Sequence, residues 1–233
     1  VFIISASIIW WLITAQKDSK SVEVSLAAEP RESQKDNFLR LIKIPAFQIV
    51  LVMSVGIFFF NHGLNNWLPE ILRSKGLSAT EAGYYASIPA AFAVIASLSI
   101  PGLATPNRRI WILFIMFSAC GVSSLVLHSI DGTILPFALV LQGIARGCMM
   151  TLSILILLDI PQVGSKRAGV AGGMFFSAAE IGGVMGPVSI GMMSDWSGGF
   201  SSTLYMLTAV SVVLLILLTA LWHQKAQNDS LTF

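Results

Sequence analysis

The sequence predicts an all-α protein that crosses a membrane several times, and three observations support this fold class. Hydrophobic residues make up 55% of the 233 residues and charged residues only 11%, whereas soluble domains carry about 25% charged residues. The apolar residues are gathered in runs of about 17 to 25, the length that a helix needs to cross a bilayer. Most connections between these runs are short, which is typical of antiparallel neighbours in a helical bundle.

We expect one partial and six complete membrane spans. The chain begins inside an apolar run, residues 1–15, without the charged start or cleavage site of a signal peptide, so we expect that the N-terminal part of the protein is missing. A polar loop, 16–45, follows and is expected to end in a short interfacial helix. The complete spans lie within residues 46–222 and are followed by a tail, 223–233. They are expected near residues 46–69, 80–102, 110–128, 133–157, 169–193 and 201–222.

Local signals mark where several spans begin and end. The first complete span enters at Pro45 and is expected to end at Pro69, because proline interrupts helical hydrogen bonding. The next span begins with Ser78 and Glu81, which have the spacing of a capping box. The spans at 110–128 and 201–222 are nearly apolar all round, as expected of helices that face lipid.

The placement of Lys and Arg predicts the orientation in the membrane. One side is expected to receive eleven of these residues and the other only two, Arg73 and Lys75. Cytoplasmic loops carry an excess of Lys and Arg. We therefore expect a multi-pass protein of the plasma (inner) membrane, with the long loop and the C-terminus in the cytoplasm.

Two charged residues, Arg146 and Glu180, lie near the middle of apolar spans. A charge at a membrane-helix centre costs about 2.5 to 3.5 kcal/mol, so such residues pair or face a watery pathway. Because the two lie on successive spans, they could meet at a similar depth. The alternatives are a functional site, such as an anion site with a proton carrier, and a structural salt bridge between two helices.

Helical spacing places other polar residues on faces near these charges. Gln142, Arg146, Met149 and Ser153 recur at intervals of four, three and four residues and form one stripe. The guanidinium could bind a planar anion through two parallel hydrogen bonds, or be satisfied by Gln142 and nearby carbonyl groups. The candidate substrate-binding residues are Arg146, Gln142, Ser153, Asn61, Asn65 and Ser54, and the candidate proton-coupling residues are Glu180 and His62.

Histidine has an unperturbed pKa near neutrality, so His62 could carry a proton; the alternative is a packing residue, which a lone histidine in a membrane helix often is. The span at 169–193 is the richest in glycine, with small residues four apart at 169/173 and at 182/186. This spacing lets helix backbones approach closely. We expect this face to pack against the missing part of the protein.

Several strings resemble the C-terminal half of a major facilitator superfamily transporter. They are residues 65–72 (NNWLPEIL), 76–78 (GLS), 82–83 (AG), 186–187 (GP), 191–195 (GMMSD) and 198–199 (GG). The first string is most similar to the cyanate and nitroimidazole transporter subfamily. The turn at 102–109 (GLATPNRR) resembles the family's loop motif but has Thr105 in place of its Asp. The resemblance implies a six-helix bundle of two inverted three-helix repeats, preceded by the end of the sixth helix, with solute bound between two halves.

We expect a secondary active transporter, working by alternating access, that carries a small solute. The solute is expected to be an anion moved with protons by symport. The alternatives are efflux of a hydrophobic or cationic compound and a membrane receptor or scaffold that does not transport. The sequence has no phosphate loop, no Gly-x-Ser-x-Gly and no His/Glu metal spacing, so we expect no enzyme activity, cofactor or metal. The expected partners are the solute, the lipid bilayer and the missing N-terminal half, and no nucleic acid.

Overall fold

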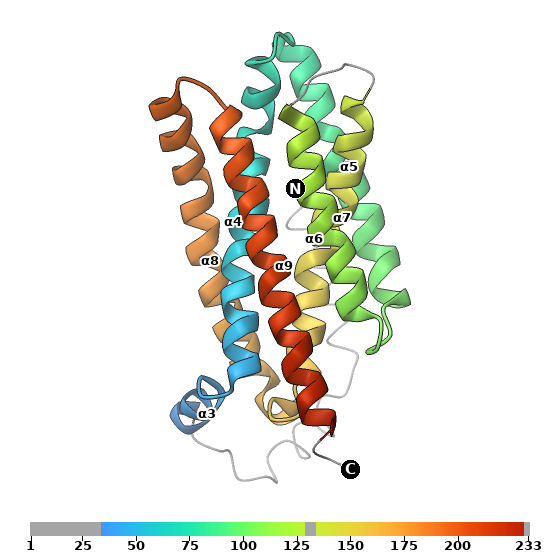
Figure 1. Cartoon of the computed structure of the whole chain (residues 1–233), viewed down its shortest axis with the longest axis vertical. Coiled ribbons are helices and arrows are strands. Elements are labelled where there is room, and N and C mark those ends of the chain that lie inside the picture. The colour runs from blue at the N-terminus through green and yellow to red at the C-terminus, as the bar shows by residue number, and fades with distance from the viewer. Residues whose placement is uncertain (1–33, 129–133, 231–233) are drawn as a thin grey trace, which may run out of the picture. The chain divides into compact units, whose positions relative to one another are not determined.

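The computed structural model describes residues 34–128 and 134–230, which are helical apart from short turns (Figure 1). The chain divides into two units, Val1–Asp36 and Asn37–Phe233, and only residues 34–36 of the first are described. The first described helix is α3, Gln34–Leu41. The partial span expected at 1–15 and most of the loop expected at 16–45 therefore lie outside the described residues.

Six long helices follow α3 in the described part of the chain, and each is long and apolar enough to cross a membrane. Consecutive helices run in opposite directions (Figure 1). The expected six-helix membrane bundle is thus confirmed. The helices are α4 (Pro45–Arg73), α5 (Ala79–Leu103), α6 (Arg109–His128), α7 (Leu135–Leu158), α8 (Gly164–Ser197) and α9 (Ser201–Ser230).

The helix ends agree with some of the local signals and differ from others. The expected capping box is present at the start of α5, where Ser78 Oγ accepts from the Glu81 N–H at 3.3 Å and Glu81 Oε2 accepts from the Ser78 N–H at 2.9 Å. The expectation that the first complete span ends at Pro69 is wrong, because α4 continues to Arg73. Proline inside a membrane helix leaves a backbone carbonyl group without its helical donor, and it is tolerated where neighbouring groups satisfy that carbonyl. Helix α9 also continues beyond its expected end, to Ser230.

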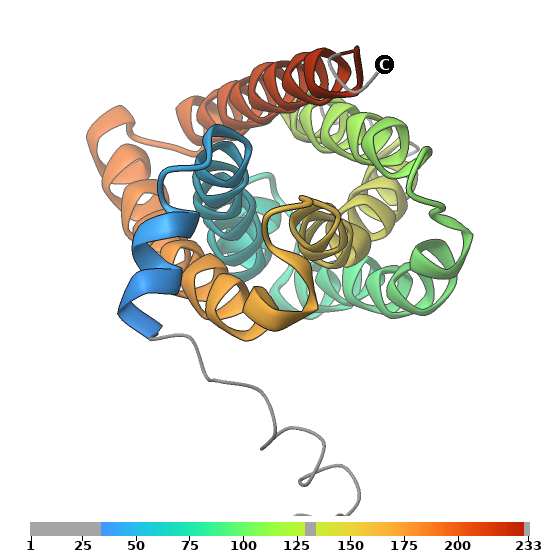
Figure 2. The same ribbon diagram turned by 90° about the horizontal axis from the view of Figure 1, so that it is seen from below.

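The six helices of Asn37–Phe233 form three layers of two, as seen from below in Figure 2. Helices α4 and α7 lie in the middle, with α8 and α5 on one side and α9 and α6 on the other. Helix α4 packs on α8 and α9, and α7 packs on α5 and α6. In α4 and in α7, half of the most apolar stretch of the helix is buried inside the bundle. The corresponding buried share is 11% in α5 and 22% in α8. The outer face of α5 and α8 is therefore the most open apolar surface of the bundle.

The contacts between helices follow an internal repeat. The first repeat is α4, α5 and α6, and the second is α7, α8 and α9. Helix α4 packs on α8 and α9, the second and third helices of the other repeat. Helix α7 likewise packs on α5 and α6, the second and third helices of the other repeat. This is the arrangement that two inverted three-helix repeats predict.

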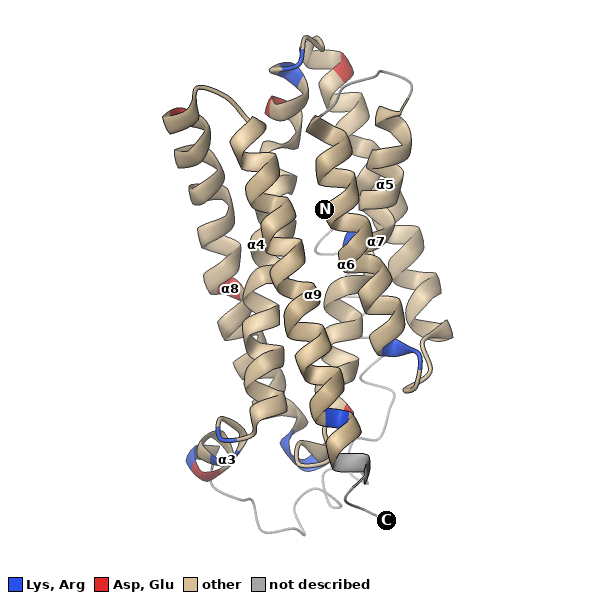
Figure 3. Ribbon diagram, in the orientation of Figure 1, with Lys and Arg blue, Asp and Glu red and all other residues tan. Residues whose placement is uncertain are grey.

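Charged residues lie mainly at the two ends of the bundle, and few lie between them (Figure 3). The end with the α4–α5 turn carries Lys75, whose Nζ donates to the Leu127 and His128 carbonyl oxygens at 2.6 and 2.9 Å. A cation at this position satisfies free carbonyl groups at the end of α6. Burial lowers the pKa of the Lys75 ammonium. The opposite end holds the starts of α4, α6 and α8 and the end of α9, and it carries more basic residues: Lys43, Arg108, Arg109, Lys166, Arg167 and Lys225.

Candidate solute-binding site

Arg146 of α7 is half-buried and bonds to Asn61 of α4. Its Nε donates to Asn61 Oδ1 at 2.9 Å, and its Nη2 donates to the Asn61 carbonyl oxygen at 3.0 Å. The two N–H groups of Nη1 make no hydrogen bond with the described residues. The guanidinium therefore joins the two middle helices and keeps donors free for another partner.

No ion pair joins Arg146 and Glu180 in the structure, although the sequence allowed one. Arg146 bonds to Asn61 instead, and the Glu180 side chain is exposed on α8. The reason lies in the packing of the helices: α8 packs extensively on α4, and contacts between α7 and α8 are few. Helices α7 and α8 are thus successive in the sequence but are not close neighbours in the bundle. A structural salt bridge between these two residues is not what holds the bundle together.

Glu180 lies instead beside His62 of α4. A Cβ atom placed on Gly183 would lie 3.2 Å from Glu180 Oε2, 3.7 Å from a carbon of Phe58 and 3.8 Å from His62 Cγ. The three side chains therefore border one small gap over a glycine. His62 stacks on Phe58 with ring centroids 5.3 Å apart, and Phe176 meets Phe58 edge to face at 6.4 Å. The two candidate proton-coupling residues are brought together, with no hydrogen bond or ion pair between them.

The remaining polar residues expected on α4 do not share one environment. Asn65 is exposed one turn after Asn61, so these two belong to one polar strip. Ser54 is fully buried, and its hydroxyl donates to the carbonyl oxygens of Leu51 and Phe175 at 2.7 and 3.2 Å. Ser54 therefore satisfies backbone groups between α4 and α8 and does not face the strip.

The polar stripe expected on α7 points into the bundle apart from Arg146. Gln142 and Met149 are fully buried and Ser153 is 1% exposed. The Ser153 hydroxyl donates to the Met149 carbonyl oxygen at 2.8 Å, whereas the amide of Gln142 has no partner among the described residues. Because α7 is a middle helix, a stripe spaced at four, three and four residues faces other helices. Gln142 therefore does not bond to Arg146, in contrast to the alternative in which Gln142 and nearby carbonyl groups satisfy the guanidinium.

The glycines of α8 serve two different surfaces. A Cβ atom on Gly186 would lie 3.0 Å from the Phe59 carbonyl carbon and 3.1 Å from the Gly63 nitrogen, and Gly182 lies equally close to the backbone of α4. The expectation that this pair packs against a missing half is therefore wrong, because it packs on α4 of the same bundle. Gly169, Gly172 and Gly173 would meet nothing within 4 Å. For them the expectation stays a prediction.

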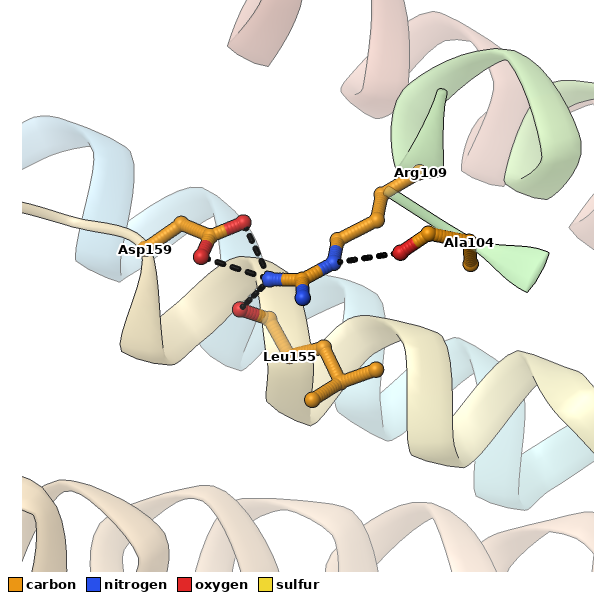
Figure 4. A network of polar contacts seen from close by, with 4 residues as sticks. All are labelled: Ala104, Arg109, Leu155 and Asp159. Atoms are coloured by element: carbon orange, nitrogen blue, oxygen red, sulfur yellow. Dashed lines mark hydrogen bonds and ion pairs between the residues drawn. The ribbon is translucent and has the colours of Figure 1, made fainter. Parts of the chain in front are cut away.

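A second polar network lies at the end that carries more basic residues (Figure 4). Arg109, at the start of α6, donates from Nη1 to both oxygens of Asp159 at 2.5 and 2.6 Å and to the Leu155 carbonyl oxygen at 3.2 Å. Its Nε donates to the Ala104 carbonyl oxygen at 3.1 Å. From the sequence, Arg109 is one of several basic residues near helix ends, and nothing marks Asp159 as its partner, because the two residues lie fifty positions apart. No three His, Cys, Asp or Glu side chains of the described part are grouped closely enough for a metal.

Comparison with known proteins identifies the family. Residues 1–161, more than half of the chain, match the sequence profile of the Major Facilitator Superfamily. The chain therefore belongs to the Major Facilitator Superfamily. The proposed likeness to the cyanate and nitroimidazole subfamily stays a prediction.

Two relatives give the comparison more detail. The chain is 25% identical over 207 residues to a quinolone resistance transporter of Acinetobacter baumannii. This match covers 86% of the chain and 45% of the relative. The chain is also 26% identical over 191 residues to a protein of Agrobacterium vitis named "Putative tartrate transporter". This second match covers 77% of the chain and 42% of the relative. The chain thus spans less than half the length of these relatives.

Proposed function

We propose that this chain is the C-terminal half of a secondary active transporter for a small organic anion, and that Arg146 binds the anion. The observation that carries the proposal is a half-buried guanidinium in the middle layer, with free N–H groups beside the polar strip of Asn61 and Asn65. A guanidinium binds carboxylates through a planar fork. The relative named for tartrate, a dicarboxylate, fits this substrate class.

Glu180 and His62 are proposed to carry the coupled proton by symport. Both are exposed, and both border the gap over Gly183. His62 follows Asn61 directly in α4, so the anion site and the proton site share one turn of helix. Binding at one site can therefore change the geometry of the other.

The bundle is proposed to lie in the plasma membrane with its more basic end in the cytoplasm, as the excess of Lys and Arg in cytoplasmic loops favours. The open apolar face of α5 and α8 is proposed to contact an N-terminal six-helix half. Labelling reagents that cannot cross membranes test the orientation. Single cysteines introduced beside Lys166 should react only from the cytoplasm, and those introduced beside Lys75 only from outside. Reaction of both from the same side would contradict the proposed topology.

A second candidate function is the efflux of a hydrophobic or cationic compound. The relative named for quinolone resistance favours it, as does the exposed Glu180 next to the rings of Phe58 and Phe176. In this case Glu180 would bind the cation and the rings its apolar part. Arg146 would then have no direct role in substrate binding.

Transport by the full-length protein in liposomes separates the two functions. Radiolabelled tartrate and a panel of other small carboxylates are tested for uptake, and a quinolone is tested for efflux. For the anion transporter, Arg146→Lys should lower carboxylate uptake at least about tenfold, because an ammonium cannot form the planar fork. Arg73→Lys, at an exposed helix end, is the matched control. Uptake that is equal in both variants, or no carboxylate uptake at all, would overturn the proposal.

A further inference from the structure

The two hydrogen bonds between Arg146 and Asn61 have the geometry of a bound carboxylate. Nε and Nη2 form one edge of the guanidinium, and this edge is one of those that pair side by side with two oxygens. Here the two acceptors are Asn61 Oδ1 at 2.9 Å and the Asn61 carbonyl oxygen at 3.0 Å. Both come from one residue of the facing helix. An internal pair of oxygens thus occupies one of the edges that an anion can use, whereas the Nη1 end of the guanidinium stays free.

We propose that Asn61 is an internal competitor of the transported anion, held on Arg146 while the site is empty and displaced when an anion binds. This proposal rests on the proposed role of Arg146 as the anion site. The neutral oxygens of Asn61 satisfy the guanidinium between two apolar helices, where an unpaired charge is costly. A carboxylate forms stronger, charge-assisted bonds with the same donors and therefore replaces them.

The position of Asn61 gives this exchange a consequence for the bundle. The Arg146–Asn61 bonds join α7 to α4, and these helices otherwise make few contacts. An anion that binds to these guanidinium donors breaks the hydrogen bonds between α7 and α4. The apparent affinity for the anion then depends on the fraction of molecules in which Asn61 is not bonded to Arg146. Asn61 therefore sets the apparent affinity of the site.

Asn66 provides a matched control. It lies on the same helix, is exposed, and its amide donates within α4 to the His62 carbonyl oxygen at 2.8 Å. The variants Asn61→Ala and Asn61→Asp are compared with Asn66→Ala and Asn66→Asp in the full-length protein in liposomes. Asn61→Ala removes one of the two oxygens, and Asn61→Asp replaces the amide with an anion. The Asn66 pair makes the same chemical changes away from the guanidinium.

The first readout is the reactivity of Arg146 with phenylglyoxal, followed by mass spectrometry of the peptide that contains it. Asn61→Ala should raise the rate of modification about tenfold, and Asn61→Asp should lower it by a similar factor, as expected for losing or strengthening a hydrogen bond to a charged group. Both Asn66 variants should stay within about twofold of the parent. Equal rates in Asn61→Ala and Asn66→Ala would overturn the proposal, as would the absence of modification in every variant.

The second readout is protection of Arg146 by tartrate. Half-protection of Asn61→Ala should need about one tenth of the tartrate that the parent needs, because no competitor has to be displaced. Asn61→Asp should not be protected. Different results contradict the two proposals. Uptake that is unaffected by Arg146→Lys would contradict the role of Arg146 as the anion site. Equal protection of Asn61→Ala and the parent would contradict only the role of Asn61 as a competitor.

Discussion

The indole N–H of Trp67 donates to the carbonyl oxygen of Pro187 at 2.9 Å and so joins α4 to α8 across their interface. The ring also covers Gly191, where a Cβ atom would lie 2.9 Å from Trp67 Cζ2. Pro187 lies inside α8 and cannot donate a backbone hydrogen bond. The missing proline N–H leaves the Gly183 carbonyl oxygen without its usual helical donor, whereas Trp67 donates to the carbonyl oxygen of Pro187 itself. The contact therefore joins α8 to α4 close to the interruption but does not replace the lost bond.

Trp67→Phe should lower the free energy of unfolding by about 1 kcal/mol, the net value of one hydrogen bond, together with the lost ring contacts. The measurement is thermal unfolding of the protein in detergent. Trp111→Phe is the control, because Trp111 is 59% exposed and makes no hydrogen bond in the described part of the chain. A melting temperature lowered equally by both changes would show that the bond to Pro187 contributes nothing.

Gly186→Ala should destabilise the bundle, whereas Gly172→Ala should not. Both glycines lie inside α8, where alanine is favoured over glycine by about 1 kcal/mol. At Gly186 that gain is outweighed because the new methyl group would press on the backbone of α4, 3.0 Å from the Phe59 carbonyl carbon. At Gly172 nothing lies within 4 Å. Thermal unfolding of the two variants tests the difference, and a stable Gly186→Ala would contradict the close α4–α8 contact.

The Arg109–Asp159 pair should stabilise the end of the bundle that carries more basic residues. The two side chains are 16% and 32% exposed, so solvent screens the pair only in part. Arg109→Gln and Asp159→Asn should each destabilise by about 1 kcal/mol, and the double variant should lose less than their sum. The Arg73–Glu70 pair, half-exposed on both sides, is the control and should show little coupling. Strictly additive losses at Arg109 and Asp159 would mean that the two side chains act independently.

Arg146→Gln and Glu180→Gln should affect stability additively, because no contact joins the two residues. Neither change should rescue the other, in contrast to a buried ion pair, where removing both partners can be nearly neutral. Unfolding of the two single variants and the double variant measures the coupling energy. The proposed function adds that the double variant folds but does not transport. Transport by the double variant close to that of the parent would reduce both residues to a structural role.

The sequence predicted the elements well and their neighbours poorly. Six apolar runs and the Ser78–Glu81 cap are local features, so they could be found without knowing what packs against what. The burial of Gln142 and Ser153 could not be found in this way. Polar residues at a helical period mark one face, but only the position of α7 in the middle layer decides that this face is internal.

The same limit explains the charges and the glycines. Arg146 was recognised because charge is rare inside an apolar span, but its partner Asn61 lies on a helix eighty-five positions away. Gly182 and Gly186 share their four-residue spacing with Gly169 and Gly173, yet only the first pair touches α4. Spacing predicts that a close approach is possible, and the packing of the other helices determines where it occurs.

The burial of both cysteines makes the chain a ready background for site-directed labelling. Cys120 is 1% exposed and Cys148 is fully buried, and they are the only cysteines in the sequence. A thiol reagent should therefore find no exposed native cysteine in this chain. Single cysteines placed on the polar strip of α4 or on the open face of α8 could carry spin labels or fluorophores without prior removal of the native thiols. Distances between one label on each of the two helices would follow the movement of α4 against α8 directly.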